Sequence, residues 1–256
     1  WVNPAHKKDP NDAEKKADRL WSLAEAQAIV DAVQGQVATV TEESKPSNKS
    51  SPGLFDLTSL QREANGRFGF SAKTTLQLAQ SLYERHKVLT YPRTDSRHLP
   101  EDYVPEVHKT FEMLADSGMR HLAPFATKAL ADNMVRKLPR VFDNKKVSDH
   151  FAIIPTLQAP KGLSEAEQKL YDLVVRRFMA VFYPPAEYQV TTRFSEVAGH
   201  RFRSDGKVLV KEGWLAIYGK EADSDDDDGK TLAAVQPGEA VPLSAAEAKA
   251  LKTRPP

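Results

Sequence analysis

The stretch Ser164–Phe194, SEAEQKLYDLVVRRFMAVFYPPAEYQVTTRF, contains both kinds of hydrophobic periodicity found in this chain. Its first four residues match the capping box, in which a serine and a glutamate three positions later cap the amino end of a helix. Apolar residues then recur at helical spacing until Pro184 and Pro185, which end the helix. Beyond the prolines apolar and polar residues alternate, so the period changes to that of a β-strand. The chain is therefore predicted to contain both α and β structure.

Strands are expected on both sides of a mainly helical stretch. Residues 37–41 predict an early strand, and the turn sequence Ser204–Lys207 predicts a hairpin into a late one. Between them Ser71 is the predicted N-cap of a helix over 72–85, whose apolar stripe ends at Tyr83, and another helix is predicted over 103–117. We expect the early and late strands to join one β domain, into which the helical residues are inserted.

Three further segments complete the organisation. Residues 11–33 predict a helix that Gly35 ends, because apolar residues recur there at helical spacing among charges. The polar stretch 44–53 predicts a linker or domain boundary. The run Asp225–Asp228 is interpreted as a solvated loop rather than a cation site, since adjacent carboxylates beside glycine are usually solvated.

Composition excludes several classes of site. The 256 residues include no cysteine, so disulfides, thiolate nucleophiles and cysteine-ligated zinc are ruled out. The sequence contains no run of about 20 apolar residues, which is the length needed to span a bilayer. It starts at Trp1, without an initiator methionine or a signal peptide. We expect a soluble cytoplasmic protein with no membrane partner. A net charge of +1 leaves nucleic-acid binding open, because neutrality can conceal a basic groove.

Residues 88–97, VLTYPRTDSR, bring a nucleophile, cations, hydroxyls and a carboxylate together. Pro92 disfavours a helical conformation at Tyr91, which is therefore predicted to be extended at the end of a short strand. Alternate residues of an extended chain share a face, which aligns Tyr91, Arg93 and Asp95. A phenol, with a reference pKa of about 10, is a poor nucleophile until a cation favours its phenolate. Arg93 could do this and hold a phosphate oxygen, while Asp95 could orient Arg93 or Ser96.

The same residues also have an ordinary structural interpretation. Tyr91 could be a half-buried strand residue, with Arg93 and Asp95 forming a surface ion pair. His150 interrupts the apolar stretch 147–156. It is either a structural histidine or a group that donates a proton to, or pairs with, a phosphate near neutral pH. Spacing alone does not separate these alternatives.

Several segments, in order, resemble type IA DNA topoisomerases. They are LQREAN at 60–65, FGFSA at 68–72, LAQSLYE at 78–84, LTYPRTDS at 89–96, DHFAIIPT at 149–156 and YDLVVRRF at 171–178. The fourth is similar to the family's active-site motif and the fifth to its later histidine motif. The proline directly after the tyrosine points to the topoisomerase III branch.

The resemblance implies that Tyr91 forms a transient 5′-phosphotyrosyl bond with one DNA strand, that Arg93 positions the phosphate and that His150 contacts DNA at the scissile region. Another strand would pass through the gap before religation, giving relaxation or decatenation without ATP because the covalent link retains the bond energy. By the same analogy the DNA-binding residues are Gln61, Arg62, Asp95 and Ser96. Gln61 and Arg62 are equally well interpreted as exposed residues of a helix without a role in binding.

The family fold is a toroid, in which a β-rich arch domain carries an inserted, mainly α-helical domain with the active-site tyrosine. Here the resemblance predicts an arch of 21–56 and 184–243, a catalytic-tyrosine domain of 57–183, and gate-domain remnants at 1–20 and 244–256. The family's toprim domain, which holds Mg2+ and carries a catalytic lysine and glutamate, lies upstream. We therefore expect an inactive, monomeric internal fragment that binds no metal itself. Its expected partners are single-stranded DNA and the missing toprim and gate domains of the same polypeptide. We expect the protein to be associated with nucleoid or plasmid DNA.

Two other enzyme classes also attack DNA with a tyrosine. A tyrosine recombinase should show several widely spaced arginine and histidine partners, and a rolling-circle nicking enzyme a histidine-rich metal cluster; neither pattern is present. A non-catalytic single-stranded DNA-binding module, in which Tyr91 never reacts, stays open as an alternative, because arginine, lysine and aromatic side chains near Tyr91 could meet phosphates and stack on bases.

Overall fold

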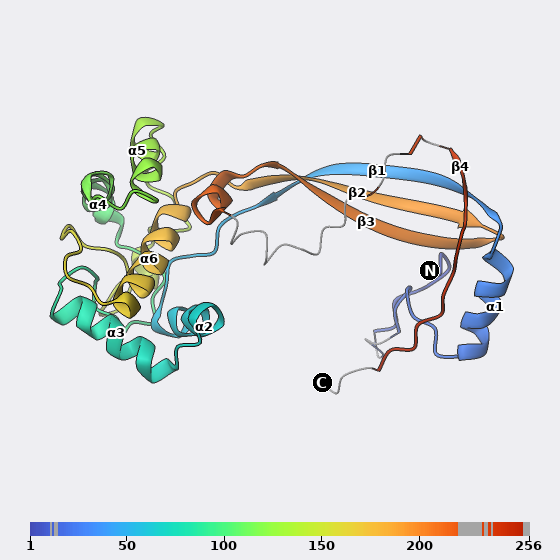
Figure 1. The fold of residues 1–256 in the computed structure, drawn as a ribbon, viewed down its shortest axis with the longest axis horizontal. Coiled ribbons are helices and arrows are strands. Elements are labelled where there is room, and N and C mark those ends of the chain that lie inside the picture. Colours follow the sequence, from blue (N-terminus) through green and yellow to red (C-terminus); the bar gives the residue numbers. More distant parts are fainter. Residues whose placement is uncertain (11, 13–14, 220–231, 233–234, 237, 253–256) are drawn as a thin grey trace. The chain divides into compact units, whose positions relative to one another are not determined.

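The computed structural model describes residues 1–256 except 11, 13–14, 220–231, 233–234, 237 and 253–256 (Figure 1). The described residues divide into two units. The first contains Trp1–Ser47, Tyr188–Val210 and the described residues of Asp226–Pro256, and the second contains Asn48–Glu187 and the described residues of Lys211–Asp225. The acidic run 225–228 lies outside the described residues. Assignment of these units to arch, tyrosine and gate domains stays a prediction.

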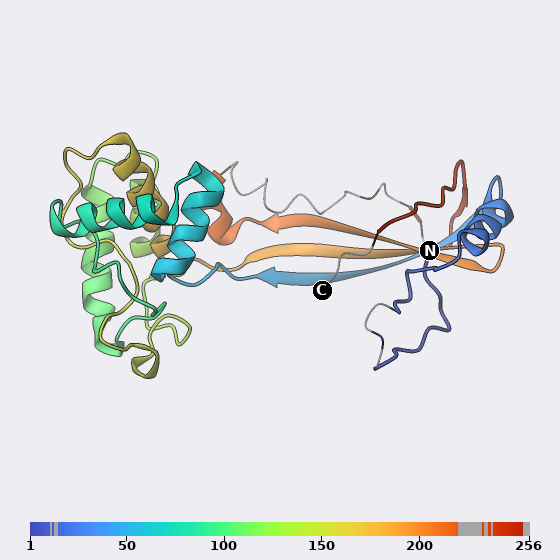
Figure 2. The same ribbon diagram turned by 90° about the horizontal axis from the view of Figure 1, so that it is seen from below.

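The first unit is built on a four-stranded sheet with the order β3-β2-β1-β4. Three strands are long and lie side by side (Figures 1 and 2). The strands are β1 (Val37–Lys49), β2 (Ala186–Val197), β3 (His200–Lys211) and the short β4 (Ala240–Pro242). Strand β4 is antiparallel to β1, with Val37 opposite Pro242. The prediction that early and late strands join one sheet is therefore confirmed.

The hairpin turn between β2 and β3 lies earlier than predicted. It is formed by Ala198 and Gly199, whose φ angles are +49° and +76°. Two consecutive residues with positive φ are typical of a type I′ turn, whose twist matches that of the flanking strands. The predicted turn at Ser204–Lys207 is wrong, because these residues continue β3, and Asp205 there accepts a hydrogen bond from Thr192 of β2 at 2.8 Å.

Two other boundaries differ from the prediction. Strand β1 runs through most of the polar stretch expected to be a linker, because a neighbouring strand supplies partners: the hydroxyls of Ser44 and Thr191 are 2.6 Å apart. The border between the two units still falls inside that stretch, after Ser47. Helix α1 (Leu23–Val33) is shorter than the expected helix over 11–33, because the Ser22 hydroxyl accepts from the backbone of the first turn and begins the helix there.

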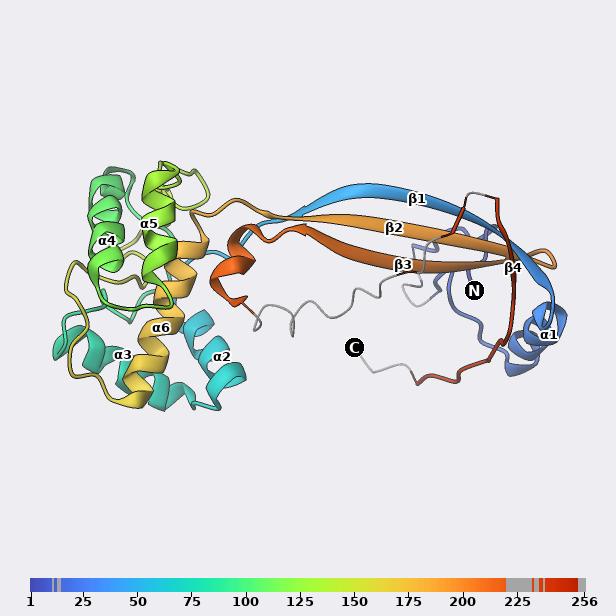
Figure 3. The same cartoon turned by 45° about the horizontal axis from the view of Figure 1, so that its top comes forward.

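The second unit is mainly helical. Its helices are α2 (Leu57–Phe68), α3 (Ala72–Glu84), α4 (Val104–Asp116), α5 (Ala123–Ala131) and α6 (Glu165–Ala180), with 3-10 turns η1 (Glu101–Tyr103), η2 (Asn144–Lys146) and η3 (Gly213–Ile217). Helix α6 is buried along most of its length and packs against α2 and α3, while α4 and α5 pack against each other (Figure 3). No helix of the described residues is long and apolar enough to cross a membrane.

Capping explains why the helices begin where the sequence predicts. Ser71 caps α3 through the backbone N–H of Thr74, and Ser164 and Glu167 form the complete capping box of α6. The predicted helices over 72–85 and 103–117 are confirmed as α3 and α4. Helix α5, which is only nine residues long, was not predicted.

Candidate functional site

The segment that leads to Tyr91 is tied to the histidine-containing segment far away in the sequence. Leu89 and Pro155 form an isolated antiparallel bridge. The Thr90 backbone N–H donates to the carbonyl of Ile154 at 3.0 Å, and the N–H of Ile154 donates back to the Thr90 hydroxyl at 2.9 Å. These bonds hold the two segments in register, so the structure brings together the tyrosine motif and the histidine motif.

The chain beyond Tyr91 alternates between the interior and the solvent. Pro92, Thr94 and Ser96 are buried, whereas Arg93 and Asp95 are exposed and Tyr91 is half-buried. This alternation is that of an extended chain, in which every second side chain shares a face. Pro92 itself lies at a bend of the chain, so the common face of Tyr91 with Arg93 and Asp95 stays a prediction.

Tyr91 lies in a group of aromatic rings. The ring centroids of Tyr91 and His150 are 4.3 Å apart with an interplanar angle of 41°, and the Tyr83 ring meets Tyr91 edge-on at 5.4 Å. The Thr94 hydroxyl donates to the backbone carbonyl of His150 at 3.1 Å, which fixes the histidine beside the tyrosine motif. The sequence places Tyr83 only on the apolar stripe of a helix, and nothing local marks it as a neighbour of Tyr91.

The two charged residues after Tyr91 do not pair with each other. Arg93 is exposed and forms no hydrogen bond or ion pair within the described part of the chain. Asp95 accepts a hydrogen bond from the Ser148 hydroxyl at 3.3 Å. The expectation that Asp95 orients Arg93 or Ser96 is therefore wrong, and so is the alternative of a surface ion pair. The guanidinium of Arg93 is left available for an anion.

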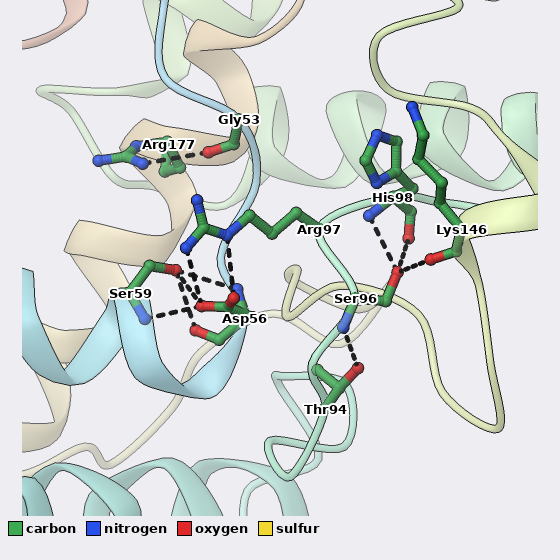
Figure 4. Close-up of polar contacts among 9 residues, drawn as sticks. All are labelled: Gly53, Asp56, Ser59, Thr94, Ser96, Arg97, His98, Lys146 and Arg177. Carbon is green, nitrogen blue, oxygen red and sulfur yellow. Dashed lines mark hydrogen bonds and ion pairs between the residues drawn. The ribbon is translucent and has the colours of Figure 1, made fainter.

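Ser96 has a structural place in this segment. Its buried hydroxyl donates to the carbonyl of Lys146 at 2.7 Å and accepts from the N–H of His98 at 3.2 Å, and its own N–H donates to Thr94 (Figure 4). The hydroxyl thus lies inside the fold, where it fixes the backbone behind the exposed face. A direct contact between Ser96 and DNA stays a prediction.

Gln61 and Arg62 lie on α2, and within the described residues neither forms a hydrogen bond or ion pair with Tyr91 or His150. The Gln61 amide donates to the carbonyl of Ala72 at 3.0 Å and so links α2 to the start of α3. Arg62 is exposed and lines a pocket beside α2. The roles in DNA binding that the resemblance implies for both residues stay predictions.

Two ionisable groups near the tyrosine motif have shifted pKa values. Burial lowers the pKa of His98, the charge of Lys146 lowers it further, and Asp143 partly opposes them. Burial would raise the pKa of Asp56, but hydrogen bonds from Ser59 and Arg97 outweigh it and hold this pKa below its ordinary value. Asp56 is therefore ionised and His98 neutral at pH 7.

The described residues do not offer a ready metal site. No group of three or more histidine and acidic side chains among them could together hold an ion. Asp95 and Asp149, the exposed acids nearest in sequence to Tyr91 and His150, belong to no such group. The residues present therefore do not fit a Mg2+ centre contained within the described part of this chain.

Comparisons with known proteins agree with this geometry. The family described as DNA topoisomerase matches residues 2–256. The chain is 39% identical to DNA topoisomerase 3 of Bacillus licheniformis over 251 residues, covering 96% of this chain and 34% of that protein. Identity to DNA topoisomerase 3 of Bacillus subtilis is also 39%, over 253 residues, with the same coverage of 96% and 34%. The chain thus spans about a third of the length of these relatives.

A solved structure shares the fold. Full-length topoisomerase I from Thermotoga maritima matches with a TM-score of 0.59 at 22% identity, covering 90% of this chain and 36% of that one. At this identity the match supports the fold alone, whereas the family match extends over nearly the whole sequence. The chain therefore belongs to the DNA topoisomerase family, in its type IA, topoisomerase III-like branch.

Proposed function

We propose that this chain is the tyrosine-bearing part of an enzyme that changes DNA topology by cleaving one strand through a 5′-phosphotyrosyl intermediate. The observation that carries the proposal is the arrangement around Tyr91. Its ring lies 4.3 Å from that of His150, and two residues later the chain carries Arg93, an exposed cation with no partner among the described residues. In the proposed mechanism Tyr91 is the nucleophile, His150 contacts DNA at the scissile region and Arg93 binds the phosphate.

In the proposed reaction the Tyr91 oxygen attacks the phosphorus of a phosphodiester in single-stranded DNA. A bond forms between that oxygen and phosphorus, the bond from phosphorus to the 3′ oxygen breaks, the phenol loses its proton and the 3′ oxygen gains one. Arg93 stabilises the negative charge that builds on the phosphoryl oxygens. His150 contacts the scissile phosphate beside the phenol. Religation is the reverse reaction and needs no ATP, because one phosphoester bond replaces another.

Strand passage and the full activity belong to a longer protein in this proposal. The toprim domain would supply Mg2+, which neutralises phosphate charge, and no step through it is assigned to residues of this chain. Without that domain and the rest of the gate domain, the isolated chain is expected to bind DNA but not to cleave it. Relaxation, decatenation, a monomeric state and a cytoplasmic location with nucleoid DNA stay predictions.

The test is to detect the covalent intermediate. The segment of the Bacillus subtilis relative that precedes the matched region would be fused ahead of Trp1, and the protein incubated with 5′- or 3′-labelled single-stranded DNA and Mg2+. We expect an adduct that resists denaturant and retains the DNA on the 3′ side of the break, joined through its 5′ phosphate.

Two tyrosine variants make the test specific. Tyr91→Phe should abolish the adduct, whereas Tyr83→Phe, which changes the neighbouring ring in the same aromatic group, should retain it. An adduct that persists in Tyr91→Phe would exclude Tyr91 as the nucleophile. Binding of DNA by the wild-type fusion without any adduct would favour the non-catalytic module.

A further inference from the structure

A pocket of about 740 Å3 lies beside helix α2 in the second unit, which also carries Tyr91. One face of α2 forms a wall of the pocket. The lining residues of this helix are Ser59, Arg62, Glu63, Gly66 and Arg67. Their spacing of three and four positions is that of a single helical stripe. The opposite wall includes Trp214, Leu215 and Tyr218, in and directly after η3.

The described residues that line the pocket include more cationic than acidic side chains. Its lining includes five cationic side chains and one carboxylate: Lys49, Arg62, Arg67, Arg97 and Arg177, with Glu63. Glu63 is shared between Arg67, at 3.2 Å, and Arg177. Asp56, which does not line the pocket, pairs with Arg97 at 2.9 Å. With Lys49 left aside, the four arginines outnumber these two carboxylates among the described residues, which favours an anion as the ligand.

The walls favour a phosphate backbone over bases as the ligand. Trp214 and Tyr218 are buried, meet edge-on at 5.6 Å, and so leave little ring surface on which a base could stack. Arg62 is exposed and has no hydrogen bond or ion pair among the described residues, while the side chain of Arg97 is 48% exposed. Exposed guanidinium groups bind phosphate oxygens through two-point contacts without reading the base.

The exposed face that carries Tyr91 leads to this pocket. Tyr91, Arg93, Asp95 and Arg97 alternate with buried residues along one extended segment. Six residues of extended chain span at most about 20 Å, so a strand of a few nucleotides at Tyr91 can reach Arg97. Figure 4 shows the Arg97 side chain reaching from this segment to Asp56 and Ser59 at the start of α2.

We propose that the α2 pocket holds the backbone of the cleaved DNA strand on the 3′ side of the break. This inference rests on the proposed function, because a 5′-phosphotyrosyl bond leaves that part of the strand attached to the unit that carries Tyr91. The attached strand runs from Tyr91 past Arg93 and Arg97 to Arg62. Its retention there keeps the broken end close to its religation position while the other strand passes.

The first experiment measures binding of this chain to a fluorescent oligothymidylate of about 12 nucleotides over a series of salt concentrations. Gly66 provides a matched pair of variants, because it is helical and a Cβ there would meet open space. Gly66→Glu introduces a carboxylate into the pocket, whereas Gly66→Ala adds only a methyl group. We expect the glutamate to weaken binding by about tenfold or more and the alanine to leave binding unchanged.

Arginine variants give a second, quantitative readout. Arg62→Gln should lower the slope of log K against log salt by about 0.7 for the one phosphate contact that it removes. Arg120→Gln, which changes an exposed arginine of the same unit outside the pocket, should leave the slope unchanged. Equal binding by the two Gly66 variants, equal slopes for the two arginine variants, or no binding by the wild-type chain at low salt would overturn the proposal.

A third experiment tests which side of the break occupies the pocket. In the fusion that carries the upstream domain, Gly66→Glu should reduce adduct yield on substrates with several nucleotides 3′ of the cleavage position. It should have no effect when that side is shortened to one or two nucleotides. If the effect of Gly66→Glu on adduct yield disappears when the 5′ side of the substrate is shortened instead, the assignment is refuted. Absence of the adduct in the wild type refutes the cleavage mechanism itself, whereas the salt slopes test the pocket without any adduct.

Discussion

We expect the substitution Glu167→Gln to destabilise the second, mainly helical unit, because Glu167 is almost fully buried as an anion. Its side chain is 10% exposed. One carboxylate oxygen accepts from the Ser81 hydroxyl of α3 at 2.7 Å, and the other accepts from the backbone N–H and the hydroxyl of Ser164, each at 2.8 Å. A nitrogen of His86 lies 3.2 Å from the first oxygen. The residue thus caps α6 and joins it to α3.

These contacts set the magnitude of the effect. The hydrogen bond from Ser81, followed by that from the Ser164 backbone, lowers the pKa of Glu167 from 4.5 to about 2 against the opposing effect of burial. One pKa unit corresponds to about 1.4 kcal/mol, so the ionised form contributes about 3 kcal/mol to stability at pH 7. Because the pKa is depressed on folding, this stabilisation is complete above pH 4.5 and is lost as pH falls through about 2.

The assay is urea unfolding followed by fluorescence of Trp214, made the single tryptophan by Trp1→Phe and Trp21→Phe. In this background Glu167→Gln should lower the free energy of unfolding by about 3 kcal/mol at pH 7 and by about 1.5 kcal/mol at pH 3. The control Glu165→Gln changes a side chain of the same helical turn that is 84% exposed, and should cost less than about 1 kcal/mol. An equal loss at the two pH values would refute the reasoning.

Three further predictions follow from contacts in the second unit. Arg177→Met leaves the Glu63 carboxylate without its buried partner and should lower the free energy of unfolding by about 3–5 kcal/mol in the same assay. A decrease below about 1 kcal/mol would show that this ion pair contributes little to stability. Gly213→Ala places a Cβ 2.3 Å from the carbonyl oxygen of Pro185 at a φ of +51°, so it should cost more than about 2 kcal/mol, and a fully stable variant would be inconsistent with this approach. His150→Ala, at an exposed position, should retain thermal stability while slowing adduct formation in the fusion by about 10²-fold or more, and an unchanged rate would remove His150 from the mechanism.

Local sequence signals were sufficient where a feature depends on neighbours a few residues away. Ser71 and Ser164 begin their helices through hydrogen bonds to residues three positions later. Pro92 restricts the residue before it, and the alternating burial around Tyr91 agrees with that restriction. The family motifs also lie in continuous stretches, so they identified the family before any fold was known, and the family match bears this out.

Features that depend on distant partners were missed or misplaced. The polar stretch after residue 41 looks like a linker by composition, but a partner 147 residues away makes it part of a strand. The turn between β2 and β3 was predicted at Ser204–Lys207 but lies at Ala198–Gly199, because the pairing of the two strands keeps Ser204–Lys207 inside β3. Strand boundaries are set by their neighbours rather than by their own residues.

The sequence by itself therefore determined the starts of α3 and α6 and the family, because capping hydrogen bonds and motifs of a few residues encode them. The tertiary structure alone decided that His150 and Tyr83 meet Tyr91, that Asp95 bonds to Ser148 rather than to Arg93, and that a basic pocket forms beside α2. Each of these depends on packing that brings residues together from separate helices and loops, and no local pattern in the chain records such a meeting.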